Sequence, residues 1–362
     1  PLLDLQRGTF NLTNQAVTIE TGGLFGEQLE LKSDLTVNIQ EGVTNCGLIL
    51  GSGMLGGPLV NAAEGEVRAS AANSLNFTGT AAENSGEVRL LGGIVDFHGP
   101  LTNMTGGRIT GRGTFNARAG LMNLGHVALS SGITDIYGDV TNETGNAAVG
   151  ITVSGNADVT FWDDVTNTTG LFRVTAISCA TIFGAFGGNG ISGAGDVYFE
   201  ADITPGSSPG LAAFGGNVHF GPLVDLQIEL AGTTKSTQYD ALDIAGTAAL
   251  DGTLDVSLLG GFMPSAGDVF EIITAAAGIT GTFADVLLPA LAGDLFWNLD
   301  YSTNAVTLAV AAPGLDGDYN GDGTVDAADY IVWRKSPGDH GGDPAGYTTW
   351  RANFGATAAG AA

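Results

Sequence analysis

Oxygen-bearing side chains recur at alternating positions in DYNGDGTVDAAD, the stretch from Asp318 to Asp329. Positions 1, 3, 5, 9 and 12 of this stretch are Asp318, Asn320, Asp322, Asp326 and Asp329. Gly at position 6 permits a sharp turn, and Thr324 at position 7 can offer its main-chain carbonyl. Because Ca²⁺ takes about six to eight oxygen ligands, this set predicts one Ca²⁺ site.

The spacing is that of an EF-hand loop, with Asp329 in place of the usual glutamate at position 12. Asp329 is one methylene shorter, so bidentate binding requires the following helix to come closer. The loop carboxylates repel one another without a cation, so we expect metal binding to be linked to folding of the loop. A solvated acidic turn is the alternative interpretation.

A tyrosine–tryptophan–arginine pattern follows the loop and occurs twice. Tyr330-x-x-Trp333-Arg334 is repeated as Tyr347-x-x-Trp350-Arg351. With the loop, this pattern resembles a type I dockerin, a module of two calcium loops and helices. The resemblance implies Ca²⁺ binding and a docking role for the helices. Only Asp339 and Asp343 remain where the second loop should lie, so one calcium site is expected intact and the second lost. We expect the two tryptophans to pack on each other or on the end of the stalk; a partner-binding surface is the alternative.

The rest of the chain is poor in charge and unbalanced toward acid. Its 362 residues include 38 acidic and 12 basic ones, for a formal charge of −26. The basic footprint that phosphates require is missing, which argues against nucleic acid as a partner. Abundant acid favours Ca²⁺ as a counterion and an extracellular location. No run approaches the ~18 apolar residues of a membrane span.

An aliphatic-x-Asn-Gly-like pattern marks the first half of the chain as repetitive. From Asn61 the markers recur every 19 to 25 residues, at Asn61, Asn84, Asn103, Asn123, Asn142 and Asn167, with weaker echoes at Asn14 and Asn45. Each unit contains two or three short alternating segments and Gly-rich corners, without a helix-length stretch. Units this small must stack, which predicts an all-β fold, a parallel β-helix with an asparagine ladder at one corner.

From about Ile203 the alternation becomes more regular and carries Pro-Gly, Asp-Gly and Gly-Gly turns. The region from Gly187 to Val310 resembles the closing module of autotransporter-associated β-helix repeat proteins. That resemblance implies a surface-exposed stalk without catalysis. We therefore predict β-helix coils over 1–202, a closing β-solenoid module over 203–312, a helical calcium module over 313–355 and a tail over 356–362.

Two further groups of residues bear on chemistry. Asp96 and Asp135 each lie seven residues before a marker, with Asn116 in the coil between them, so they would project from one face two coils apart. Such a pair could serve a glycosidase, but an outward polar ladder is favoured.

Cys46 and Cys179 fall about six coils apart, too far for a disulfide.

These features favour a non-enzymatic, extracellular structural or adhesive β-solenoid of the cell surface or matrix, attached through its calcium module. The expected partner is a protein, or a second copy bound through the module or the solenoid ends; exposed strand edges at those ends would also permit a filament. A carbohydrate-active enzyme or a polysaccharide-binding protein on the same solenoid is the alternative.

Overall fold

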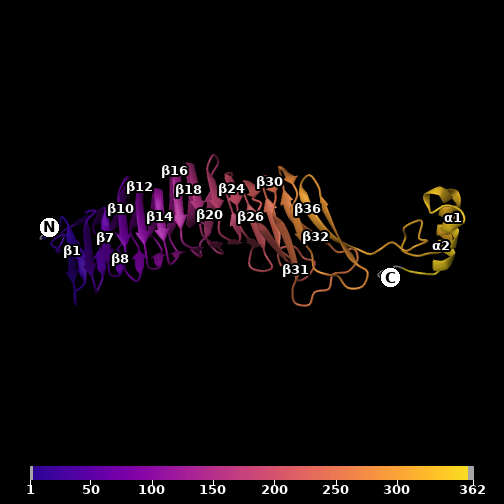
Figure 1. Ribbon diagram of the computed structural model, residues 1–362, viewed down its shortest axis with the longest axis horizontal. Helices are drawn as coiled ribbons and strands as arrows, with labels where there is room; N and C mark the ends of the chain where they lie inside the picture. The colour runs from indigo at the N-terminus through magenta and orange to yellow at the C-terminus, as the bar shows by residue number, and fades with distance from the viewer. Residues whose placement is uncertain (1–2, 358–362) are drawn as a thin grey trace.

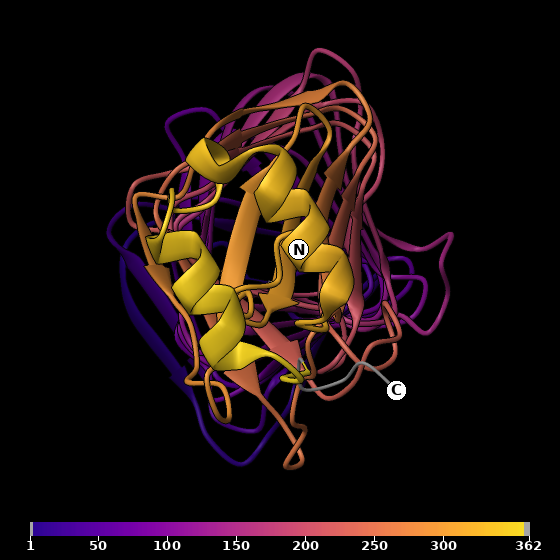
Figure 2. The same ribbon diagram turned by 90° about the vertical axis from the view of Figure 1, so that its right-hand side faces the viewer.

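A computed structural model describes residues 3–357, so only the first two residues of the predicted tail at 356–362 fall within it. The chain forms a long solenoid of stacked parallel strands, followed by a short linker and two helices (Figure 1). The predicted all-β solenoid with a small helical module at its C-terminal end is confirmed. Viewed from that end, the two helices lie in front of the stacked coils (Figure 2).

One sheet follows the asparagine markers along the whole rod. It has 13 strands, each paired in parallel with its counterparts in neighbouring coils. In chain order these are β2 (Val17–Ile19), β5 (Val43–Asn45), β8 (Leu59–Asn61), β11 (Ala82–Asn84), β13 (Leu101–Asn103), β15 (Leu121–Asn123), β17 (Val140–Asn142), β19 (Val165–Asn167), β22 (Phe186–Gly188), β25 (Ile203–Pro205), β28 (Asp225–Leu230), β31 (Thr253–Leu258) and β34 (Asp285–Leu287).

A second sheet of 17 strands forms the remaining faces of the early coils and one face of the later ones. In the other coils, two separate strands lie on either side of one corner. Strands β12, β14, β16 and β18 instead continue through this corner as single long strands. The members are β1 (Gly8–Leu12), β3 (Gln28–Leu31), β4 (Leu35–Ile39), β6 (Leu48–Gly51), β7 (Gly53–Gly56), β9 (Glu66–Ser70), β10 (Ser74–Phe77), β12 (Glu87–Phe97), β14 (Arg108–Ala117), β16 (His126–Tyr137), β18 (Gly150–Phe161), β20 (Leu171–Val174), β21 (Cys179–Ile182), β24 (Asp196–Phe199), β27 (Asn217–Phe220), β30 (Thr247–Leu250) and β33 (Gly278–Gly281).

A third sheet begins late and closes the C-terminal end of the rod. Parallel pairing through β23 (Gly190–Ile191), β26 (Leu211–Phe214), β29 (Ala241–Ile244) and β32 (Val269–Ala275) ends in an antiparallel hairpin of β35 (Phe296–Tyr301) and β36 (Ala305–Ala311). The first two sheets continue through the predicted boundary at 202/203 without a break. The hairpin covers one edge of the last coil, which is one way in which β proteins protect open edges.

Alternating burial along the strands places one apolar core inside the coils. In β4, for example, Leu35, Val37 and Ile39 are buried and the residues between them are half-buried. Columns of aromatic rings fill the interior, and Phe97, Phe115, Phe161 and Phe199 are each at most 2% exposed. Since neighbouring strands lie ~4.8 Å apart, each buried ring packs on the coils before and after it.

The marker asparagines form the predicted ladder, and it is buried. Each Nδ2 donates to the Oδ1 of the next marker at 2.6–2.8 Å, from Asn45 through Asn61, Asn84, Asn103, Asn123 and Asn142 to Asn167. All seven are at most 2% exposed. They end strands with their side chains inside the coil, whereas Asn14 lies outside the column, since Ile19 pairs with Asn45. The ladder ends where Gly188 takes the place of the next asparagine.

Cys46 and Cys179 are both free thiols, as their predicted separation requires. Among the described residues, no helix is long and apolar enough to span a bilayer.

Candidate metal centre

The loop from Asp318 to Asp329 is shaped by its own side chains. Asn320 Oδ1 accepts from the amide of Asp322 at 2.9 Å, and Asp322 Oδ1 accepts from the amide of Thr324 at 3.0 Å. Asp318 accepts from the amides of Gly321 and Gly323, each at 2.8 Å. These short-range bonds fold the loop so that its polar residues bend around Asp318. Gly323 has φ +85°, in the left-handed region that a side chain disfavours.

Asp329 is the buried end of this arrangement, with no exposed surface. Its carboxylate accepts from the amides of Tyr319, Asn320 and Asp326 at 2.8 to 2.9 Å. Burial would raise the pKa of Asp329, but these hydrogen bonds outweigh burial and hold the pKa below its ordinary value. Asp329 is therefore a carboxylate, the form in which it could ligate a cation.

Helix α1 (Ala327–Lys335) begins at the last loop residues, and they cap it. Asp326 is the N-cap and accepts from the amide of Ala328 at 2.7 Å, while Asp329 reaches back to the amide of Asp326. This reciprocal capping box satisfies two free helical donors. The same two carboxylates thus fix the loop to the helix and occupy the predicted ligand positions 9 and 12.

The two tryptophans pack within the helical module. Helix α2 (Ala345–Asn353) lies against α1. Tyr330 lies 5.0 Å from Trp350 between ring centroids, and Trp333 lies 5.5 Å from Tyr347, with the two tyrosines 6.0 Å apart. Trp350 Nε1 also donates to the main-chain oxygen of Asp326 at 2.6 Å. The aromatic repeat seen in the sequence therefore joins the two helices and ties α2 to the loop.

Where a second calcium loop would lie, the chain forms a 3₁₀ turn, Pro337–Asp339, and both Asp339 and Asp343 are exposed. The first loop pairs instead with the segment after α2. Val325 and Ala356 share a backbone hydrogen bond, and Thr324 bridges Thr357. In the described part of the chain, the hydrogen bonds of residues 315–357 stay inside this module. The module is thus a self-contained unit at the end of a short linker.

The predicted ligands Asp318, Asn320, Asp322, Thr324, Asp326 and Asp329 are all brought into one loop. Their donor chemistry and the turn at Gly323 suit Ca²⁺. Across residues 3–357, however, no three His, Cys, Asp or Glu side chains converge closely enough to form a cation cluster unaided. The loop amides point to Asp318 instead, so a bound cation would have to draw the remaining oxygens inward.

The acidic pair considered for glycoside chemistry is not assembled. Asp96 lies beside Asn116 in the next coil, as predicted, but Asn116 lies beside Tyr137 and not beside Asp135. The corner after Tyr137 is two residues shorter than the corner after Asn116, which moves Asp135 into the neighbouring outward column. Counting back from the markers was therefore wrong for Asp135.

Asp96 is also not an exposed member of an outward polar ladder. It is 3% exposed beneath Arg118, which binds it with two hydrogen bonds, Nε to Oδ1 at 2.8 Å and Nη2 to Oδ2 at 2.5 Å. His98 lies nearby, with Nε2 3.6 Å from Oδ2. This bidentate ion pair links two coils and leaves the carboxylate little access to a substrate.

Sequence reasoning missed a row of aromatic rings on the outer surface of the rod. Tyr137, Trp162 and Phe183 follow one another in consecutive coils and stack with ring planes within 7° of parallel. A signal was present, since DIYGDV, TFWDDV and TIFGAF each place an aromatic residue at the outward position before the corner.

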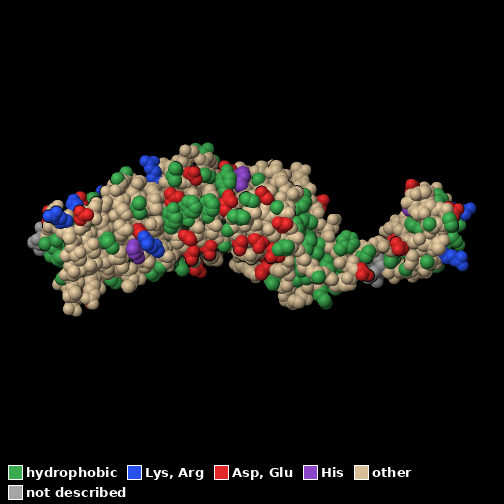
Figure 3. Space-filling model, in the orientation of Figure 1, with side chains coloured by type: hydrophobic (Ala, Val, Ile, Leu, Met, Phe, Trp, Pro, Cys, Tyr) green, Lys and Arg blue, Asp and Glu red, His purple; other side chains and the backbone are tan. Residues whose placement is uncertain are grey.

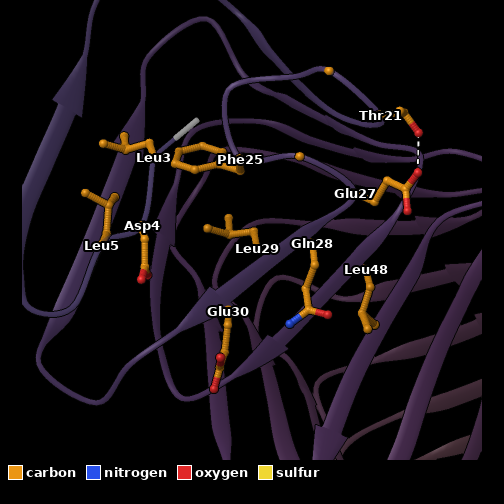
Figure 4. A pocket seen from close by; sticks show the side chains of 12 residues that line it. Leu3, Asp4, Leu5, Thr21, Phe25, Glu27, Gln28, Leu29, Glu30 and Leu48 are labelled. Carbon is orange, nitrogen blue, oxygen red and sulfur yellow. Dashed lines mark hydrogen bonds between the residues drawn. The ribbon is translucent and has the colours of Figure 1, made fainter. Parts of the chain in front are cut away.

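A hollow lies at the first coils of the solenoid (Figure 4). Leu3, Leu5 and Phe25 line one part of it, and Glu27 and Glu30 another. Glu27 accepts a hydrogen bond from Thr21. The apolar residues of the hollow are continuous with the core of the coils, so core side chains border the hollow at this end of the solenoid.

No protein-family model and no curated protein sequence matches this chain.

Proposed function

We propose that the chain is an extracellular structural β-solenoid, an acidic stalk that attaches or assembles through a calcium-stabilised helical module. The observation that carries the proposal is the pairing of a uniform rod with a self-contained module. The rod stacks parallel coils along its length, the earlier ones around a buried asparagine ladder, and the module concentrates its acidic oxygens in one loop.

The module fits a single Ca²⁺ ion held by the side chains of Asp318, Asn320, Asp322, Asp326 and Asp329 and by the Thr324 carbonyl. Asp318 and Asp329 lie at the two ends of the loop and anchor it through amide hydrogen bonds. A dication would offset the repulsion among the four carboxylates, so binding and ordering of the loop would be coupled. The proposal includes a dockerin-like docking role for the module. Its partner would be another protein or a second copy of this chain.

Isothermal titration calorimetry with Ca²⁺ tests the metal site. The wild-type chain should bind one ion, and Asp318→Ala should abolish the heat, because Asp318 is both a ligand and the acceptor of the loop amides. Asp316→Ala removes a nearby carboxylate outside the loop and is the matched control; it should bind as the wild type does. An unchanged heat for Asp318→Ala would contradict the site.

Electron microscopy tests the structural role. The purified protein should appear as rods, and end-to-end assembly in Ca²⁺ that disappears on chelation would support attachment through the module. Single rods under both conditions would remove self-assembly and leave a different protein as the partner.

A further inference from the structure

Three aromatic rings form an exposed row on the middle coils. Tyr137 and Trp162 are each 40% exposed and Phe183 is 43% exposed. Ring centroids are separated by 5.8 Å between the first two and by 4.7 Å between the last two. These separations exceed those of rings stacked directly face to face, so neighbouring rings are offset sideways. Each ring therefore leaves an edge and part of a face in solvent.

Neighbouring side chains hold this row in place. Trp162 Nε1 donates to Asp135 Oδ1 at 3.0 Å, which fixes the indole plane. In the adjacent outward column Asp135 is followed by Thr160, Thr181, Tyr198 and His219. The rings of Tyr198 and His219 stack at 4.3 Å between centroids. The surface therefore presents rings, hydroxyls and carboxylates in fixed positions along the rod axis.

Negative charge surrounds the aromatic row. Between Arg118 and Lys235 the sequence contains 11 acidic residues and a single basic one, Arg173. Asp139, Asp163 and Asp164 lie at the corner next to the row and are exposed. Figure 3 shows hydrophobic side chains gathered over these middle coils with acidic ones beside them, and Lys and Arg mainly toward the two ends of the chain. An anionic polymer would be repelled from this face.

We propose that this aromatic row and its flanking carboxylates bind an amine-bearing polysaccharide lying along the rod. The repeat of the surface is one coil, ~4.8 Å, which is close to the length of one pyranose unit. Sugar rings can then lie against successive aromatic rings while their amino groups pair with the carboxylates.

The spacing argues against an extended basic peptide, the other cationic polymer. Its side chains on one face recur every ~6.7 Å, twice the rise per residue, so each successive side chain lies ~1.9 Å farther along than the next coil. The charge argues against an acidic polysaccharide. The acidic surface calls for a partner with positive charge, and the coil spacing calls for a repeat of pyranose length. A polymer of amino sugars has both.

Microcalorimetry or tryptophan fluorescence with a soluble glucosamine oligomer tests the proposal on the full chain. Trp162→Ala should weaken binding by about tenfold or more, since it removes the central ring and the group that Asp135 orients. Trp162→Phe keeps a ring in the row and should retain most of the affinity. Asp139→Asn should weaken binding at low salt, and added salt should narrow that difference.

Controls use equally exposed groups elsewhere. Phe296→Ala removes an aromatic side chain that is 51% exposed on β35, and Asp294→Asn removes an exposed carboxylate near it; both should bind as the wild type does. Circular dichroism establishes that each variant is folded. The proposal is overturned if the glucosamine oligomer does not bind, if Trp162→Ala leaves its affinity unchanged, or if oligolysine or oligogalacturonate binds more tightly at the same row.

Discussion

Buried amides depend on one another for their hydrogen bonds, and the asparagine ladder consists of seven of them. Asn103 illustrates the dependence, because it accepts from Asn84 and donates to Asn123, each at 2.7 Å. Removing Asn103 therefore leaves one N–H of Asn84 without an acceptor inside the coil, while Asn123 Oδ1 keeps only its bond from the Gly125 amide. A buried donor without an acceptor costs about 1–3 kcal/mol, more than the net gain from an average hydrogen bond.

We expect Asn103→Ala to lower the free energy of unfolding by about 3 kcal/mol, from the unpaired N–H of Asn84, the bond lost by Asn123 and the small cavity. Asn38→Ala is the matched control. It breaks a similar amide pair, Asn38 to Asn11 at 2.8 Å, but on the outer surface, where water replaces the partner. Its cost should stay below about 1 kcal/mol. Denaturant unfolding measures both, and equal losses would contradict a special role for the buried ladder.

Asp240 gives the rod a pH dependence of its own. It is 2% exposed and accepts from the amides of Gly210 and Glu229. Burial raises the pKa of Asp240 to about 6, although these amides oppose the change. A carboxyl group whose pKa is higher in the folded than in the unfolded chain favours the folded state when protonated. Its contribution is therefore complete below about pH 4 and is lost as the pH rises through about 6.

Asp240→Asn removes this titration. The free energy of unfolding of the wild type minus that of the variant should fall by up to about 3 kcal/mol between pH 4 and pH 7. Other carboxylates titrate in the same range, so the variant must be compared with the wild type at each pH. A difference that does not change with pH would show that Asp240 keeps an ordinary pKa.

Among the elements, the strands were predictable and the corners were not. Alternating small apolar residues and the asparagine markers were enough to predict coils, stacking and the ladder, because each marker occupies the same place in the register. The outward columns depend on how many residues each corner contains. A corner shortened by two residues keeps every side chain on its original face, so the inward pattern gives no warning that Asp135 has moved.

Tertiary contacts set the remainder of the site. The capping box of α1 and the hydrogen bonds that fold residues 318–329 are local, and the calcium site expected there stays a prediction. The ion pair between Asp96 and Arg118 joins residues 22 positions apart, and the pairing of Val325 with Ala356 joins the loop to a segment beyond α2. Neither follows from a local pattern.

The glycines at the corners differ in how much a substitution by alanine should destabilise the fold. Gly111 has φ +101°, and a Cβ there would lie 1.9 Å from the carbonyl oxygen of Leu90 in the previous coil. Gly106 has a similar φ, +90°, but open space around it. Gly111→Ala should therefore separate two coils and cost more than about 3 kcal/mol, whereas Gly106→Ala should cost about 1 kcal/mol of backbone strain.

Thermal unfolding of the two alanine variants compares these costs directly. Because the backbone strain is nearly matched, the difference between them reports the contact between coils. Similar melting temperatures would mean that the coil can shift by the required distance at little cost.

For the whole molecule, the division between rod and module predicts two separate responses. Each coil pairs with its neighbours, and the described hydrogen bonds of the module stay within it. Free energy from Ca²⁺ binding should therefore stabilise the module and leave the rod almost unaffected. The proposed calcium site supplies the means of testing this.

Limited trypsin digestion of the full chain, with Ca²⁺ and with chelator, follows the module, because Arg334, Lys335 and Arg351 all lie in it. Chelation should expose these sites and release a shortened chain, while the main unfolding transition of the rod stays at the same temperature. Asp318→Ala should be cleaved at the chelated rate even in Ca²⁺, and Asp316→Ala should be protected like the wild type. A rod transition that moves with Ca²⁺ would show instead that module and solenoid are coupled, and the two would then have to be treated as one folding unit.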